Sequence, residues 1–123
     1  MRDDWLDSLA AAEIRQTLRS LPGPLREAAQ GCVIESVFMA DCLASGEVIE
    51  DDLLGLFEGS SLADPEPEAA AQLPRIRLFL DNLWDYAEKK PELFREEVHV
   101  TLLHELGHYL GLDEDEISAR GLE

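Results

Sequence analysis

Two histidines and a glutamate near the C-terminal end of the sequence are the residues best suited to chemistry. They stand in the segment HELGHYLGLDEDE, which begins at His104. On an α-helix, His104 and His108 are about one turn apart along the axis and ~40° apart around it, so both imidazoles can reach one metal ion. Glu105 lies ~100° round from His104. There its carboxylate would stand beside the ion and could deprotonate a water molecule held at the metal.

A third ligand is expected just beyond the end of this helix. Gly111 allows the chain to turn back, because glycine adopts a positive φ at little cost. Glu114, three residues later, is the predicted third ligand, and its neighbour Asp113 is the alternative. In a non-metal interpretation, Glu114 is an acid at the start of a helical turn over residues 114–119. His-Glu-x-x-His with Gly111 and an acid at position 114 is expected in roughly one in ten thousand shuffled sequences of this composition.

The ligand set indicates the kind of metal site. Two neutral imidazoles, one carboxylate and an open fourth position are typical of a catalytic zinc rather than of a closed structural one. We therefore predict one Zn²⁺ ion, with Glu105 as the general base that takes a proton from water and passes it to the leaving amine of a peptide. Cobalt, nickel or manganese can occupy the same ligands. Arg77 and Arg120 are candidates for stabilising the oxyanion.

The elements that would position these residues follow from hydrophobic periodicity and from proline and glycine signals. The metal-binding residues fall in a long helix that starts at Pro91 and ends at Gly111, and its second half is apolar nearly all round, which predicts burial. Three short strands with four or five helices predict an α+β fold, in a single domain over residues 1–123. The strands are expected at residues 32–40, 53–57 and 75–80, and the other helices at 3–21, 24–29 and 83–89.

Four other residues with chemically capable side chains are assigned to packing. His99 lies ~140° from His104 on the helix and points to the other face. Tyr109 is expected in the core rather than at an oxyanion. Trp84 and Tyr86 are likewise interpreted as core residues rather than as a platform for a substrate.

Two segments are expected beside the site. Residues 59–74 form the longest stretch without periodicity, hold three prolines and three acids, and are a candidate flap. The strand at 75–80 could offer a free edge, to which an extended peptide would add by backbone hydrogen bonds. The acidic stretches at 47–52 and 64–68 are interpreted as solvated surface.

Composition excludes several classes of partner. Lys and Arg number 10 against 27 Asp and Glu, a formal net charge of −17. Such a field repels nucleic acid and anionic lipid, and it steers a cationic partner such as a basic peptide toward the protein. No apolar run is long enough for a signal-peptide core or a membrane span. Cys32 and Cys42 have no metal-binding spacing. One disulfide between them is the alternative, but both are expected as buried thiols, so we expect a cytoplasmic protein.

The sequence also resembles a known family. HELGHYLGLDEDE, preceded by VTLL and followed by Arg120-Gly121-Leu122, is similar to the zincin-like metallopeptidases, and more narrowly to a small bacterial zincin-like domain long catalogued as a domain of unknown function. SLPGPLREA (20–28), LLGLFEGSSL (53–62), RIRLFLD (75–81) and residues 92–122 fall in that family's order. The resemblance implies a minimal zincin: a short mixed sheet of three to four strands, an active-site helix, zinc held by His104, His108 and the acid at position 114, and Glu105 as general base. A downstream Met-turn, which a metzincin would carry, is lacking, because the methionines are Met1 and Met39.

Two other functions remain open from the sequence. One is a zinc-binding interaction module on a zincin frame that cleaves nothing, in which Glu105 would be a hydrogen-bond partner in the metal site. The other is a metal-free structural domain. Metal analysis and a peptide-library assay would separate both from a peptidase.

Overall fold

A small mixed sheet lies at the centre of the molecule. The computed structural model describes residues 2–62 and 73–119. Its strands are β1 (Val33–Val37), β2 (Gly55–Glu58) and β3 (Arg75–Phe79), in the order β1-β3-β2. β3 pairs in parallel with β1 and antiparallel with β2. The expected α+β class and the short mixed sheet are confirmed.

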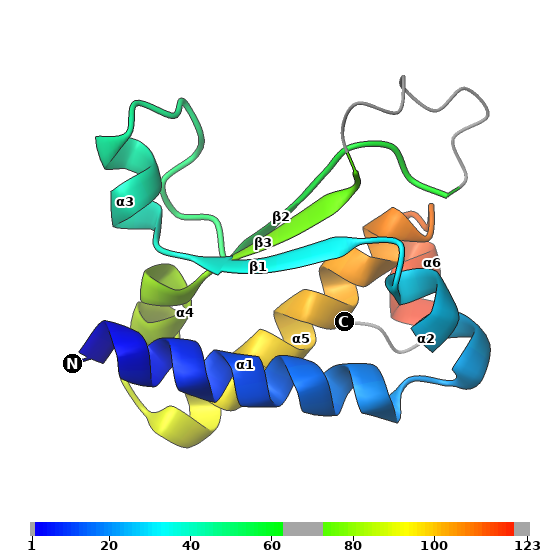
Figure 1. The fold of residues 1–123 in the computed structure, drawn as a ribbon, viewed down its shortest axis with the longest axis horizontal. Coiled ribbons are helices and arrows are strands. Elements are labelled where there is room, and N and C mark those ends of the chain that lie inside the picture. The colour runs from blue at the N-terminus through cyan, green and yellow to red at the C-terminus, as the bar shows by residue number, and fades with distance from the viewer. Residues whose placement is uncertain (1, 63–72, 120–123) are drawn as a thin grey trace.

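Helices cover the sheet on both faces. The long helices α1 and α5 lie on one face, and the short α3 lies toward the other (Figure 1). Side chains alternate accordingly: Ile76 and Leu78 of β3 are fully buried in the core shared with α1 and α5, whereas Phe79 joins a second cluster with Met39 and Cys42 of α3. The helices are α1 (Arg2–Ser20), α2 (Gly23–Ala29), α3 (Met39–Ala44), α4 (Leu80–Tyr86), α5 (Pro91–Tyr109) and α6 (Glu114–Ala119).

The expected ends of the strand at residues 32–40 and of the helix at 83–89 are wrong. β1 stops at Val37 and α3 begins at Met39, while α4 begins at Leu80, directly after β3. The carboxylate of Asp81 accepts hydrogen bonds from the backbone N–H groups of Met39 at 2.7 Å and Ala40 at 3.0 Å. Because this cap for α3 comes from a distant element, local periodicity could not indicate it.

The free edge predicted for the strand at 75–80 is also wrong. β3 is paired on both sides, along Ile34↔Ile76 with β1 and along Phe57↔Ile76 with β2. Within the described part of the chain, the unpaired edges belong to β1 and β2. β2 is the one that packs against α5, so an open sheet edge still lies beside the helix that carries the histidines.

The long helix α5 confirms the expected start at Pro91 and the expected turn at Gly111. Gly111 has φ +85°, its N–H donates to His108 O at 3.0 Å, and Leu112 N–H donates to Gly107 O at 3.0 Å. This pair of bonds is the Schellman motif, which closes a helix through a left-handed glycine. None of the helices in the described ranges has the length and apolarity needed to cross a membrane.

Candidate metal centre

His104 and His108 converge at the C-terminal end of α5. Their Nε2 atoms lie 3.3 Å apart, and the rings stand at 79° with centroids 4.9 Å apart. Two nitrogens bound to one tetrahedral zinc at ~2.05 Å would lie ~3.3–3.4 Å apart, so the pair has the separation that zinc requires. The opposite face of the same helix turns is buried through Leu102 and Leu106, which fixes the orientation of the histidines.

The third predicted ligand is described only in part. Glu114 is the first residue of α6, but its side chain lies outside the described part of the structure. Among the side chains that are described, no three His, Cys, Asp or Glu residues gather around a common point. The two imidazoles therefore fit zinc, while the role of Glu114 stays a prediction.

The alternative ligand Asp113 is engaged elsewhere. Its Oδ1 accepts a hydrogen bond from Glu116 N–H at 2.8 Å, and Asp113 N–H points back to Glu116 Oε1 at 3.4 Å. This is the reciprocal arrangement of a capping box, with Asp113 as the N-cap of α6. The turn after Gly111 thus places Asp113 at the cap and Glu114 at the first helical position.

Glu105 faces a cleft of about 310 Å³ that also reaches His104. β2 borders this cleft closely, because a Cβ atom on Gly55 would lie 2.7 Å from Thr101 Cγ2 and 3.2 Å from Glu105 Cγ. The predicted general base therefore stands beside the open sheet edge. The cleft is lined by Leu54, Gly55, Tyr86, Glu97, Val100, Thr101, His104 and Glu105.

Two aromatic residues predicted as core have different positions. Trp84 is in the core and packs edge-to-face on Trp5 and Phe94. Tyr86 is 63% exposed and lines the cleft, so its assignment to the core is wrong. It is the last residue of α4, which leaves its ring beyond the packed part of that helix.

The cleft also contains a glutamate that was not predicted from the sequence. Glu97 lies on the same side of α5 as Thr101 and Glu105, at four-residue intervals. Burial raises the pKa of Glu97, and the neighbouring charge of Glu96 raises it further. Glu97, Thr101 and Glu105 are spaced by four residues, and this spacing could have predicted that Glu97 lies on the same side of the helix as Glu105.

The other two residues assigned to packing are confirmed as such. His99 Nδ1 is hydrogen-bonded to Thr17 Oγ1 of α1 at 2.7 Å, on the face away from the site. Tyr109 is 3% exposed and packs against Phe57. Its carbonyl accepts a hydrogen bond from Leu62 N–H at 2.8 Å, so the start of the predicted flap is attached to the end of α5; residues 63–72 of that flap lie outside the described ranges.

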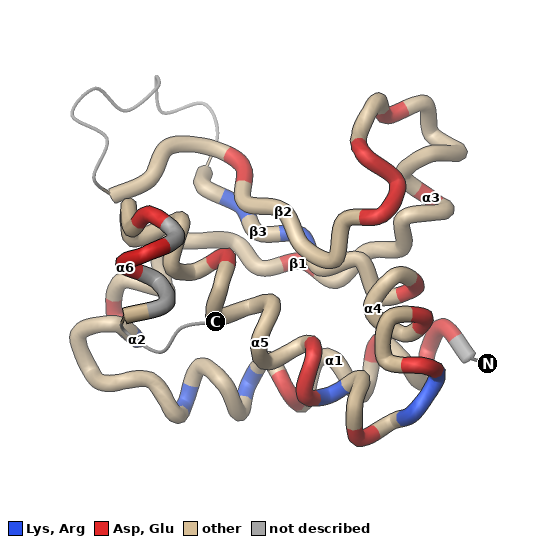
Figure 2. Tube along the Cα trace, turned by 180° about the vertical axis from the view of Figure 1, so that it is seen from behind, with Lys and Arg blue, Asp and Glu red and all other residues tan. Residues whose placement is uncertain are grey.

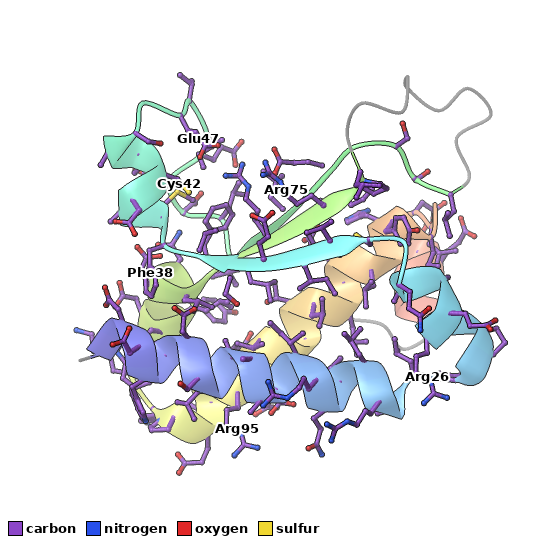
Figure 3. All side chains as sticks on the ribbon, viewed as in Figure 1. Arg26, Phe38, Cys42, Glu47, Arg75 and Arg95 are labelled. Atoms are coloured by element: carbon purple, nitrogen blue, oxygen red, sulfur yellow. The ribbon has the colours of Figure 1, made fainter. Side chains whose placement is uncertain are left out.

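Arg77 does not approach the histidines. It is 4% exposed and pairs with Glu47 at 2.9 Å and Glu58 at 2.7 Å. Cys42 and Glu47 reach toward the same side of β3 as Arg75, across the sheet from α5 (Figure 3). The candidacy of Arg77 for the oxyanion is therefore wrong, because its guanidinium group pairs with Glu47 and Glu58. Arg120 lies outside the described residues.

Acidic positions recur on both sides of the molecule, on the segment between α3 and β2 and on α6 (Figure 2). Residues 41–58 carry Asp41, Glu47, Glu50, Asp51, Asp52 and Glu58 without a Lys or Arg. Cys32 and Cys42 are both buried and free, as expected. Burial raises the pKa of the Cys32 thiol to about 11.

Comparison with known families agrees with this geometry. The sequence profile of the zincin-like metallopeptidases matches residues 32–122. The chain belongs to this family. The zincin-like match spans β1 to α6, so it includes the sheet and the histidine helix, while the resemblance at residues 20–28 lies before it. Membership in a zincin-like family implies zinc binding in general. No curated protein matches the chain.

Proposed function

We propose that this zincin-like protein is a zinc-dependent peptidase that hydrolyses peptide bonds. The observation that carries the proposal is the 3.3 Å separation of His104 Nε2 and His108 Nε2 on a helix that borders a cleft. A zinc-binding interaction module without activity is the alternative, and the experiment below distinguishes the two.

His104 and His108 would hold the ion through Nε2, and Glu114 would be the third ligand. The engagement of Asp113 in the capping box of α6 favours Glu114 over Asp113. Zinc bound there supplies Lewis acidity, which polarises a carbonyl group and acidifies water.

Glu105 would take up the proton released from water and donate it to the leaving amine. Its position in the cleft next to His104 supports this role. The outer edge of β2, which has no paired strand in the described part of the chain, would accept an extended peptide through backbone hydrogen bonds. This edge replaces the strand at 75–80 as the expected docking strand.

The expected substrate is a peptide or protein, and the net charge of −17 would attract basic ones and disfavour nucleic acid and membrane surfaces. Two buried free thiols suit a reducing compartment, so we propose that the peptidase acts in the cytoplasm.

Replacing Glu105 by Gln tests the proposal. The variant should bind zinc with unchanged stoichiometry, because Glu105 is not a ligand, while hydrolysis of a peptide library should fall ~10²–10⁴-fold. Glu96→Gln, on an exposed position of the same helix, is the control and should cleave as the unmodified protein does. Equal cleavage by Glu105→Gln would refute the general-base role. Zinc binding without cleavage by the unmodified protein would favour the interaction module.

A further inference from the structure

The cleft continues along α5 well beyond His104 and Glu105. Its far end is lined by Glu97, Val100 and Tyr86. Glu97 precedes Glu105 by eight residues, or ~12 Å along the helix axis. A substrate side chain bound near Glu97 would therefore belong to a part of the substrate other than the peptide group that reacts.

The far end combines one acid, one aromatic ring and apolar walls. Glu97 forms no ion pair within the described part of the chain, and none of the described residues that line the cleft is a Lys or Arg. Tyr86 is largely exposed and comes from α4, so its ring borders the cleft from a second helix. A carboxylate beside an aromatic ring binds ammonium or guanidinium groups, while apolar walls cover their aliphatic stems.

We propose that Glu97 and Tyr86 form a specificity subsite for a Lys or Arg side chain of the substrate, a role that presupposes the peptide hydrolysis proposed above. The net charge of −17 attracts basic peptides from a distance, whereas this subsite selects which residue of the peptide lies one or two positions from the scissile bond.

The distance between Glu97 and His104 along the helix limits the position of the basic residue in the substrate. Glu97 precedes His104 by seven residues, or ~10.5 Å along the axis. An extended Lys side chain reaches roughly 6 Å from its Cα, and an extended peptide advances ~3.4 Å per residue. A Lys or Arg one or two residues from the scissile bond therefore spans the distance.

A binding measurement tests the subsite without hydrolysis. The probes are alanine-based hexapeptides that carry one central Lys or, as the uncharged match, norleucine, titrated by NMR into the zinc-loaded full chain with Glu105→Gln. The Lys peptide should bind at least ~10-fold tighter than the norleucine peptide. Adding Glu97→Gln or Tyr86→Leu should reduce that ratio, and adding Glu96→Gln should leave it intact. An unchanged ratio with Glu97→Gln would overturn the subsite.

A cleavage measurement tests the same subsite during turnover. With a mixed peptide library, the unmodified protein should prefer Lys or Arg within two residues of the cut, Glu97→Gln should lose the preference, and Glu97→Lys should shift it to Asp or Glu. Cleavage with no basic preference, or with a preference that survives Glu97→Gln, would overturn the subsite. If nothing is cleaved but Lys binding depends on Glu97, the peptidase proposal fails and Glu97 remains only a binding site for a basic side chain; if neither occurs, both proposals fail.

Discussion

Gly55 of β2 and Thr101 of α5 lie so close that a Cβ atom on Gly55 would stand 2.7 Å from Thr101 Cγ2. The same Cβ would stand 3.2 Å from Glu105 Cγ. Thr101 is buried and β-branched, so its side chain has little freedom to move away. The absence of a side chain at Gly55 therefore sets how closely the open sheet edge approaches the predicted general base.

We expect Gly55→Ala to destabilise the protein by about 1–3 kcal/mol, because overpacking displaces β2 or α5. Urea unfolding measures this loss. Adding Thr101→Ser, which removes the contacting methyl group, should recover most of it. Gly23→Ala is the matched control, since a Cβ there meets nothing within 4 Å and should leave stability nearly unchanged. A Gly55→Ala variant as stable as the parent would contradict the close approach.

Zinc binding should depend on two histidines of α5 and not on the third. His104→Gln and His108→Gln should each lose stoichiometric zinc, because a single imidazole cannot replace the pair. His99→Gln should keep one zinc per chain, since His99 bonds to Thr17 on the other face. Metal analysis after dialysis gives the stoichiometry, and equal loss in all three variants would argue against the predicted ligands.

Removal of zinc should lower the melting temperature of the parent protein. A ligand that binds only the folded state stabilises it by mass action, so adding zinc to the chelator-treated protein should restore the transition. The variants His104→Gln and His108→Gln should melt at the same temperature with and without zinc. If the melting temperature of the parent protein is the same with and without zinc, the result would indicate the metal-free structural domain.

The neighbouring acids Asp113 and Glu114 should respond in opposite ways. Glu114→Gln should weaken zinc binding with little effect on the metal-free protein. Asp113→Asn or Asp113→Ala tests the cap, and the alanine should cost about 0.5–2 kcal/mol of stability because it removes the bond to Glu116 N–H. Zinc titration and urea unfolding of each variant separate the two roles; zinc loss on changing Asp113 alone would reverse the assignment.

Stability should fall as pH rises above about 9. The Cys32 thiol has a pKa of about 11 in the folded protein against 9.0 for a free cysteine, so the unfolded chain loses its proton first. The folded state then binds more protons than the unfolded state, and unfolding is favoured with increasing pH. Urea titrations at pH 8 and 10 on the parent and Cys32→Ala measure this, and the pH dependence should be smaller in the variant.

Local signals were sufficient where neighbouring residues determine the structure. The start of α5 at Pro91 and the positive φ of Gly111 follow from the residue types themselves. The start of α3 and the order of the strands depend on long-range contacts instead. The cap from Asp81 begins α3 at Met39, and pairing on both sides places β3 in the middle of the sheet. Tyr86 was misassigned because its hydrophobic spacing says nothing about whether another element covers it.

Crystallographic anomalous scattering at the zinc edge would locate the metal ion and identify its ligands. We predict one peak within ~2.0–2.1 Å of Nε2 of both His104 and His108, with a carboxylate oxygen of Glu114 as the third protein ligand and the fourth position open to the cleft. A peak elsewhere, or a fourth protein side chain closing that position, would contradict it.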